Sequence, residues 1–285
     1  MNVFITGASG FIGSYLTEKY KNEHKFRCFS FLRDDTSTMD FSGIDAVIHL
    51  SALVHQMNGA SEEGYERVNV DQTVLLAKKA KSAGVKRFIF MSTVKVFGEE
   101  TDTPYTESSL CKPQDTYGKT KLKAEQELFK LANDHFSVAV IRTPLVYGQG
   151  VKANMENLIN LIKKTHVLPF GSINNKRSMI YVGNLANLIN SLLISNEYGV
   201  FVAADNRPLS TSELIALIAE TLNKKIILFR LPLLETTLRY LKPAYYKRLF
   251  MSLEVDASES YKKLNIENPY SIEDSFKNMI YGEIK

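Results

Sequence analysis

Short apolar runs alternate with amphipathic stretches along the first half of the chain. Each run is followed by a glycine, a serine or an arginine, and the runs cover residues 3–6, 26–32, 46–50, 88–91 and 138–141. Buried parallel strands have this pattern because both of their faces are covered. Helical periodicity between the runs predicts helices over residues 14–24, 65–83 and 116–133. Strands that alternate with helices predict an α/β fold with a doubly wound parallel sheet.

The rhythm changes after residue 150. Ser210 or Thr211 is the expected cap of one further helix. The elements predicted in this part are helices over 154–164, 185–194 and 212–222 and a strand over 200–203.

No linker or internal repeat separates the two parts, so the second is expected to pack onto the first. We predict a domain over residues 1–150, with a return segment near 176–204, and a smaller C-terminal α/β domain over 151–285. Within the latter, residues 231–250 are aromatic and basic and are interrupted by Pro243. They could lie on a membrane surface, but the pattern favours a pair of helices packed on the core.

Composition excludes several classes of protein. Hydrophobic residues make up 45% of the 285 residues, and Lys plus Arg exceed Asp plus Glu by 35 to 31. This mild excess suits a small polyanionic ligand better than nucleic acid. The two cysteines and five histidines show no metal-ligand spacing. No apolar run approaches the ~18 residues of a membrane span, and no secretory signal is seen, so we expect a cytoplasmic protein.

Three glycines follow the first strand at once, in the stretch TGASGFIG. One glycine allows a sharp strand-to-helix turn, another allows the backbone to approach a pyrophosphate, and a third lets the helix press on the strand. The helix would then offer free N–H groups to the phosphates. Gly7, Gly10 and Gly13 therefore predict a dinucleotide site, because they stand between a strand and a helix.

The end of the second predicted strand bears on the choice between NAD and NADP. An NAD site usually places an acidic residue there to hold the adenosine ribose. Residue 30 is a serine, and Arg33 precedes Asp34 and Asp35. An arginine suits the 2′-phosphate of NADP, whereas either aspartate could turn inward for NAD. The pattern slightly favours NADP.

Tyr117 and Lys121 stand four residues apart in TYGKTK, so on a helix they share one face. Free tyrosine titrates near pH ~10 and is a poor catalyst at neutral pH. An adjacent ammonium, with an oxidised nicotinamide ring, would stabilise the phenolate and lower the pKa of the tyrosine. Ser92 and Thr93 end the preceding strand, where a hydroxyl could hold a substrate oxygen.

Seven motifs occur in the order seen in one enzyme family. They are TGASGFIG, DAVIHLSA, the asparagine of RVNVDQT, MSTVKVFG, YGKTK, RTPLVYG and KRSMIYVGNL. The chain thereby resembles extended short-chain dehydrogenase/reductases of the nucleotide-sugar epimerase/dehydratase family, over residues 1 to about 187 and more loosely to the end. The resemblance implies a Rossmann-type NAD(P)-binding domain and a smaller domain that binds a nucleoside diphosphate sugar.

The resemblance also implies residue roles. Tyr117 matches the catalytic acid–base, Lys121 the residue that tunes it and holds the nicotinamide ribose, and Thr93 the hydroxyl that binds substrate. Arg177 matches an arginine that clamps the substrate diphosphate, and Asn154 matches a nucleotide contact. With Arg33, the implied cofactor contacts are Gly7, Gly10, Phe11, Ile12, Gly13, Asp40, Leu50, Ser51, Ala52, Tyr117, Lys121 and Pro144.

Two departures from the family pattern bear on function. Dehydratases carry an Asp-Glu pair directly after the catalytic threonine, whereas Val94 and Lys95 stand here. We therefore do not expect 4,6-dehydration. The segment between the second strand and AVIHL is too short for the usual helix, which leaves the adenine-side contacts at Met39 and Asp40 open.

Two reactions at C4 of the sugar remain. The chain resembles bacterial proteins of O-antigen and capsule synthesis that reduce a UDP-2-acetamido-2,6-dideoxy-4-ketohexose, and NADP would suit such a reductase. The alternative is a UDP-glucose or UDP-N-acetylglucosamine 4-epimerase, which retains NAD. A non-catalytic NADP-binding sensor or scaffold is a remote alternative, because such proteins usually lack the tyrosine–lysine pair. His55 would lie near the sugar if its loop faces the crevice. Helices 65–83 and 116–133 resemble a family dimer interface, so we expect a homodimer.

Overall fold

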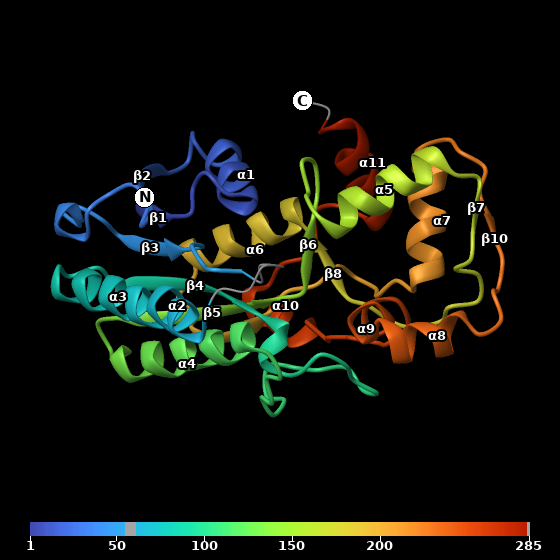
Figure 1. The fold of residues 1–285 in the computed structure, drawn as a ribbon. Coiled ribbons are helices and arrows are strands. Elements are labelled where there is room, and N and C mark those ends of the chain that lie inside the picture. Colours follow the sequence, from blue (N-terminus) through green and yellow to red (C-terminus); the bar gives the residue numbers. More distant parts are fainter. Residues whose placement is uncertain (55–60, 284–285) are drawn as a thin grey trace.

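The computed structural model describes residues 1–54 and 61–283, which form a larger and a smaller lobe (Figure 1). The larger lobe contains a six-stranded sheet in the order β2-β1-β3-β4-β5-β9, in which all neighbouring strands are parallel. The strands are β1 (Asn2–Thr6), β2 (Lys25–Phe29), β3 (Ala46–His49), β4 (Arg87–Thr93), β5 (Ser137–Thr143) and β9 (Gly199–Val202). The predicted α/β fold with a doubly wound parallel sheet is confirmed, and its switch point lies between β1 and β3.

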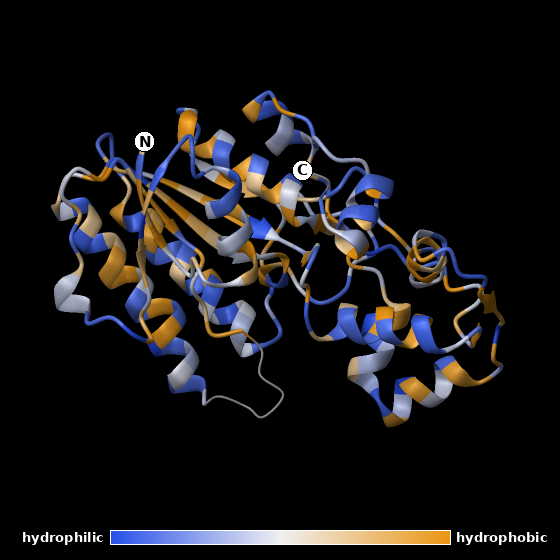
Figure 2. Cartoon of the chain, turned by 90° about the horizontal axis from the view of Figure 1, so that it is seen from above, coloured by the Kyte–Doolittle hydropathy of each residue, from blue (hydrophilic) through white to orange (hydrophobic). Residues whose placement is uncertain are grey.

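Helices cover both faces of this sheet. α1 (Phe11–Lys19) and α6 (Val182–Ile194) lie on one face, and α3 (Gln72–Ser82) and α4 (Thr116–Leu131) lie on the other. Successive strand residues enter opposite cores, so Phe4 contacts the α3–α4 side and its neighbour Ile5 the α1–α6 side. Figure 2 shows the result, because the central strands are mostly hydrophobic while the helices alternate in hydropathy.

The helix predicted over 65–83 is a composite. α2 (Glu62–Glu66) continues through a π-helical turn, η2 (Arg67–Asp71), directly into α3. Ser61 caps its start by accepting a hydrogen bond from the nitrogen of Gly64. A π-helical turn cannot be read from apolar periodicity, and such turns are frequent at functional sites.

The smaller lobe is built from residues after β5, and α6 and β9 return from it to the large sheet. Ser210 caps α7 in a reciprocal capping box with Glu213, as one of the two predicted caps. The remaining elements are η1 (Thr36–Thr38), η3 (Val94–Val96), β6 (Leu145–Tyr147), α5 (Asn154–Lys164), β7 (Val167–Leu168), β8 (Met179–Tyr181), α7 (Thr211–Thr221), β10 (Ile227–Leu228), α8 (Leu234–Leu241), α9 (Pro243–Phe250), α10 (Ser258–Leu264) and α11 (Ile272–Tyr281). The domain boundary at residue 150 stays a prediction.

Three of the sequence predictions are wrong in detail. The helix predicted over 14–24 runs from Phe11 to Lys19, and turn residues follow it. The second strand ends at Phe29 and not at residue 32, because the nitrogen of Asp34 donates to the carbonyl of Ser30 and forms a turn (2.8 Å). Residues 231–250 do form a helix pair, with Pro243 at the start of α9, but neither helix contains a buried residue. The predicted packing of this pair on the core is therefore incorrect.

Across the described part of the chain, no helix has both the length and the apolar character that a membrane span requires.

Candidate active site

The turn after β1 brings three glycines together. Gly7 has a φ of +75°, and a Cβ on it would lie 3.0 Å from the nitrogen of Ser51. A Cβ on Gly13 would lie 2.2 Å from the carbonyl oxygen of Gly7, so only glycine allows this contact. Gly10 is the N-cap residue of α1 and offers no side-chain cap. The first-turn N–H groups are therefore open to an anion, which fits the pyrophosphate of a dinucleotide. They belong to Phe11, Ile12 and Gly13.

The loop that carries Leu50, Ser51 and Ala52 is tied to its neighbours through Asn69. The nitrogen of Leu53 donates to the Asn69 side chain (2.8 Å), whose amide donates back to the carbonyl of Leu53 (3.1 Å). The same amide donates to Thr120 Oγ1 on α4 (3.2 Å). Asn69 lies in the π-helical turn and is buried. The glycine turn, this loop and α4 therefore meet at the carboxyl end of the sheet.

Tyr117 and Lys121 lie one turn apart near the start of α4, as their spacing predicts. Asp115 caps the helix by accepting from the nitrogen of Gly118 (2.7 Å). A Cβ on Gly118 would lie 2.8 Å from the carbonyl oxygen of Lys95, so the helix start is pressed against η3. Thr93 directly precedes η3, which places its hydroxyl in the segment next to Tyr117.

Lys95 and Val94 stand at the two positions where dehydratases of the family carry the Asp-Glu pair. The Lys95 ammonium forms an ion pair with Asp115 and lies 3.5 Å from Glu99. Val94 is buried. Neither side chain is a carboxylic acid, so the structure offers no proton donor for dehydration at these two positions.

Burial dominates the protonation of the tyrosine–lysine pair. The Lys121 ammonium is buried 3.8 Å from the centre of the Phe90 ring. Burial lowers the pKa of Lys121 to about 7, although Glu125 acts in the opposite direction. Burial also raises the pKa of Tyr117, and Asp115 and Tyr65 raise it further. The expected lowering of this pKa by Lys121 is therefore not produced by the protein's own groups.

A buried ion pair lies behind Lys121, and sequence reasoning missed it. The Arg142 guanidinium on β5 donates to Glu125 on α4, with Nη2 2.7 Å and Nε 3.2 Å from Oε2. Ser92 also donates its hydroxyl to Glu125. Of the two hydroxyls considered for holding substrate, that of Ser92 is thus engaged with Glu125. That of Thr93 accepts from the nitrogen of Lys95 (3.3 Å) and keeps its own proton to donate. Glu125 stands four residues after Lys121, but in a lysine-rich stretch this spacing looks like a solvated helix face.

His49 is a second buried polar group that the sequence did not single out. Its Nδ1 lies 2.6 Å from Thr6 Oγ1, its Nε2 lies 2.9 Å from Thr73 Oγ1, and its ring stacks on Phe90 at 5.7 Å. Thr6 Oγ1 also accepts from the nitrogen of Ser51 (3.3 Å). His49 therefore holds Thr6, which in turn binds the loop of Leu50, Ser51 and Ala52 beside the glycine turn.

The buried imidazole predicts a loss of stability in acid. Burial, and next the charge of Lys121, lower the pKa of His49 to about 3. The unfolded chain binds this proton near pH ~6.5, so the unfolding free energy is expected to fall as the pH drops from ~6.5 towards ~3. Urea unfolding midpoints of the wild type and of His49→Gln over this range test it. The variant should show the smaller fall; equal falls would contradict the prediction.

The adenosine side of the site is more exposed. Arg33 is exposed in the turn after β2, and Asp34 folds back there so that its carboxylate accepts from the nitrogen of Ser30 (2.8 Å). Asp40 forms an ion pair with Arg27 (2.8 Å). Between β2 and β3 there is only the short η1, which confirms that the usual helix is missing. Met39 follows η1, and Pro144 follows β5 at the carboxyl end of the sheet.

The predicted substrate residues Arg177 and Asn154 lie on different segments of the smaller lobe. Arg177 Nη1 donates to the backbone carbonyls of Met251 (3.1 Å) and Lys247 (3.4 Å) at the end of α9. Burial lowers the pKa of Arg177, and Arg248 adds to this, while Glu99 opposes it. Asn154 is exposed as the first residue of α5. His55 lies outside the described residues.

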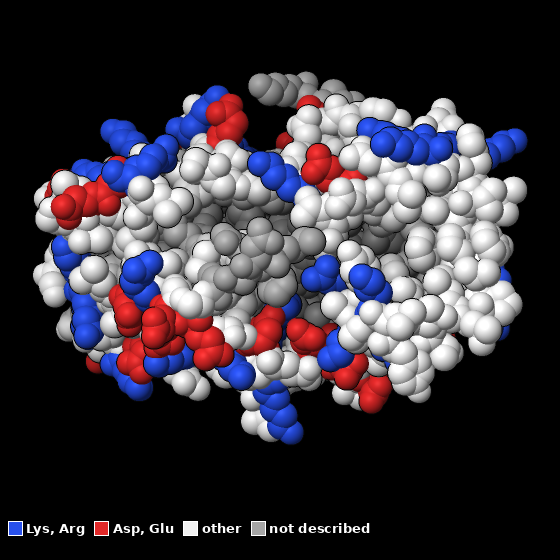
Figure 3. Space-filling view, in the orientation of Figure 1, with Lys and Arg blue, Asp and Glu red and all other residues white. Residues whose placement is uncertain are grey.

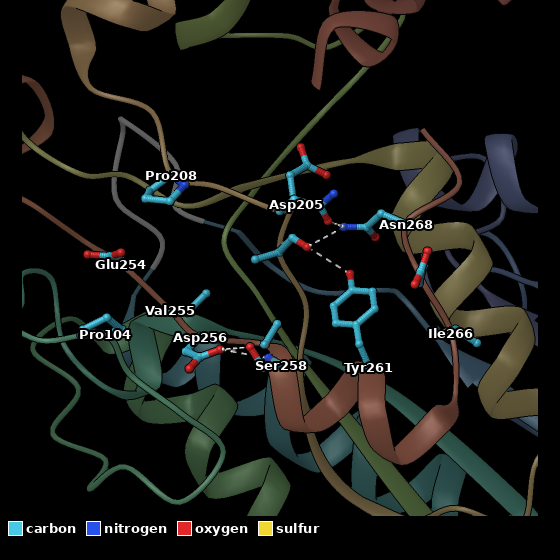
Figure 4. Close-up of a pocket in the computed structure, with 14 residues that line it drawn as sticks. Pro104, Asp205, Pro208, Glu254, Val255, Asp256, Ser258, Tyr261, Ile266 and Asn268 are labelled. Atoms are coloured by element: carbon cyan, nitrogen blue, oxygen red, sulfur yellow. Dashed lines mark hydrogen bonds between the residues drawn. The ribbon is translucent and has the colours of Figure 1, made fainter. Parts of the chain in front are cut away.

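A cavity of about 690 Å³ lies elsewhere, beyond the end of β9 (Figure 4). Tyr261 and Asn268 point into this region, and both donate to the carbonyl of Ala204 at 3.0 Å. Asp205, Glu254 and Asp256 make its lining acidic. None of the predicted cofactor or substrate residues lines it, so it is separate from the glycine turn.

The site can be compared with known proteins. A model described as the NAD dependent epimerase/dehydratase family matches residues 3–203. A UDP-glucose 4-epimerase from Vibrio cholerae is 33% identical, over 97% of this chain and 93% of that protein. An N-acetyl-alpha-D-glucosaminyl-diphospho-ditrans,octacis-undecaprenol 4-epimerase from Escherichia coli O157:H7 is 31% identical, over 81% and 75%.

The fold is also that of solved proteins. The crystal structure of a UDP-glucuronic acid 4-epimerase from Bacillus cereus in complex with NAD superposes with a TM-score of 0.80. It shares 20% sequence identity and covers 99% of this chain and 98% of its own. The match spans both lobes, so the smaller lobe as well as the sheet-containing lobe has the fold of that structure.

Proposed function

The chain belongs to the NAD dependent epimerase/dehydratase family, and from this premise we propose that it is an NAD(P)-dependent enzyme that acts at C4 of a nucleoside diphosphate sugar. The first candidate reaction is 4-epimerisation. The observation that carries the proposal is the placement of Tyr117 and Lys121 on α4 against the turn that follows Thr93, beside the glycine turn. A non-catalytic sensor, the remote alternative, would not require a tyrosine and a lysine in this arrangement.

The proposed roles follow from chemistry. Tyr117 takes the proton of the C4 hydroxyl as hydride leaves C4, and returns it when hydride is delivered to the other face. Thr93 donates a hydrogen bond that holds the C4 oxygen. Bound nicotinamide would supply the hydride acceptor and donor, and the positive charge of its oxidised ring would stabilise the phenolate form of Tyr117 that burial disfavours. Lys121 holds the nicotinamide ribose.

Two observations favour epimerisation over the reduction that the sequence first suggested. Two relatives that match 97% and 81% of this chain, at 33% and 31% identity, are named as 4-epimerases. Asp34 also folds back onto the end of β2, where an acid suits the ribose of a retained NAD. Reduction of a UDP-2-acetamido-2,6-dideoxy-4-ketohexose stays the second candidate, because the exposed Arg33 suits the 2′-phosphate of NADP. The role in surface polysaccharide synthesis and the cytoplasmic location remain predictions.

Incubation with two substrates separates these reactions. With UDP-N-acetylglucosamine or UDP-glucose and NAD, an epimerase should form the galacto isomer with no net change at the nicotinamide absorbance band. With a UDP-4-keto-6-deoxy-N-acetylhexosamine and NADPH, a reductase should consume the absorbance in proportion to product. Activity with neither pair would reject both candidates.

The choice of cofactor gives a prediction at the end of β2. Arg33→Ser should weaken NADPH binding by about tenfold, because a charged partner of the 2′-phosphate is lost, and leave NADH nearly unchanged. Asp34→Ser should do the reverse. Titrations of both variants with both cofactors test this, with Arg207→Ser, an exposed arginine of the smaller lobe, as the control. An Arg33→Ser variant that binds NADPH as the wild type does would exclude this arginine as the phosphate contact.

We propose that residues 1–150, with the return segment near 176–204, bind the cofactor and that 151–285 complete the substrate site. Arg177 uses Nη1 for the end of α9 and retains further N–H groups, which suit a sugar diphosphate. Asn154 is proposed as a nucleotide contact. The Escherichia coli relative is named for a sugar diphosphate linked to a polyprenol, whereas the Vibrio cholerae relative is named for a sugar linked to UDP. Both names contain a sugar diphosphate, so we propose a sugar diphosphate as the substrate and leave the group attached to it open.

The expected homodimer would form through the helical run α2–η2–α3 and α4. These helices pack side by side, and Leu75 and Phe129 on them remain 37% exposed each. Light scattering should therefore give about twice the chain mass of 32.2 kDa. A Leu75→Glu/Phe129→Glu variant should shift the mass towards a monomer. A wild type that stays monomeric at high concentration would contradict the expectation.

A further inference from the structure

The tip of the α8–α9 hairpin, residues 240–245, presents apolar side chains to solvent. Tyr240, Leu241 and Tyr245 are 79%, 72% and 54% exposed, and no residue of either helix is buried. The tip lies at the edge of the smaller lobe in Figure 1. A cluster of exposed leucine and tyrosine side chains indicates a surface that is covered by something else in the working protein.

The hairpin and the residues that flank it are also basic. Residues 227–252 contain five basic residues and one acidic residue, Glu235, so the net charge of this stretch is +4. The net charge of the whole protein is also +4. In Figure 3 the surface over α8 and α9 is largely uncharged, and both basic and acidic side chains border it. The basic residues are Arg230, Arg239, Lys242, Lys247 and Arg248.

We propose that the α8–α9 tip docks the enzyme onto an anionic lipid bilayer. Tyrosine and leucine insert at the boundary between headgroups and acyl chains, and lysine and arginine pair with anionic headgroups. Nucleic acid would match the charge but would leave Leu241 exposed. An acidic protein with an apolar contact face is the competing occupant, and it would give no flotation with vesicles. A bilayer matches both features.

The hairpin is connected to the candidate active site. Lys247 on α9 donates to Gln114 (3.3 Å) and pairs with Glu99 (3.5 Å), which also pairs with Lys95 beside Thr93. Arg177 donates to the carbonyls at the end of the same helix. Docking would therefore orient the substrate side of the enzyme relative to the membrane. The inference does not depend on which C4 reaction is catalysed.

Vesicle flotation with the full chain tests the proposal. The wild type should float with vesicles that contain phosphatidylglycerol, bind neutral phosphatidylcholine vesicles at least about tenfold more weakly, and detach at high salt. The variant Tyr240→Ser/Leu241→Ser/Tyr245→Ser should lose about tenfold or more in binding to the anionic vesicles while keeping the mass and the solution activity of the wild type. Ile194→Ser/Leu110→Ser, which removes residues 69% and 70% exposed elsewhere, is the matched control and should bind as the wild type does.

Three results would overturn the proposal. The proposal is wrong if the wild type fails to float with anionic vesicles, or if the tip variant floats as well as the control. A tip variant that floats normally but has half the mass of the wild type would identify the tip as a contact between two copies. Failure of the C4 reaction assays would leave these readouts unaffected.

Discussion

Replacing Tyr117 by phenylalanine is expected to lower turnover by about a thousandfold, within the range that a general acid–base contributes. The change removes one oxygen from a ring at the start of α4, beside the turn of Thr93, and leaves the glycine turn in place. Cofactor affinity should therefore stay within about twofold, because Lys121 and the N-terminus of α1 are unchanged. Turnover with the substrate that proves active and a separate cofactor titration measure the two quantities.

The control is Tyr198→Phe, which removes the same oxygen from a tyrosine that is 65% exposed and directly precedes β9, at the opposite end of the sheet from Thr93. It should retain the activity of the wild type. A Tyr117→Phe variant with more than about a tenth of wild-type turnover would place the proton transfer on another group. Loss of cofactor binding together with activity would instead indicate that the phenol supports the site structurally.

The sequence predicted the parts of this site that depend on local spacing. Gly7, Gly10 and Gly13 follow a strand directly, and each meets a steric demand that any side chain would violate or hinder. Tyr117 and Lys121 share a helix face because a helix turns once in ~3.6 residues. Such relations need no knowledge of the rest of the fold.

Contacts between distant segments could not be predicted in this way. Glu125 meets Arg142 because β4 and β5 are adjacent and α4 covers them, and Asn69 reaches Thr120 because a π-helical turn redirects it. Periodicity also misjudged residues 231–250, since an amphipathic helix looks alike whether its apolar side faces the core or a partner. Only the exposure of Leu241 and its neighbours distinguishes the two.

Glu125→Ala is expected to lower the unfolding free energy by about 3–5 kcal/mol, because it leaves the Arg142 guanidinium buried without its charged partner. The Arg142 and Glu125 side chains are only 7% and 1% exposed, so water cannot compensate for the loss. Ser92 loses its acceptor as well. Urea unfolding followed by circular dichroism measures the change, and Glu125→Gln, which keeps shape and one acceptor, should lose less.

The matched control is Glu127→Ala on the same helix, whose ion pair with Lys130 is exposed and should not matter measurably. The double variant Glu125→Leu/Arg142→Met removes both charges and should lose less than the two single changes together, since no unpaired charge remains. If the unfolding free energy of Glu125→Ala lies within about 1 kcal/mol of that of the control, the Glu125–Arg142 ion pair does not hold α4 on the sheet. The position of Tyr117 and Lys121 would then have to depend on the Asp115 cap and the contact between Gly118 and η3.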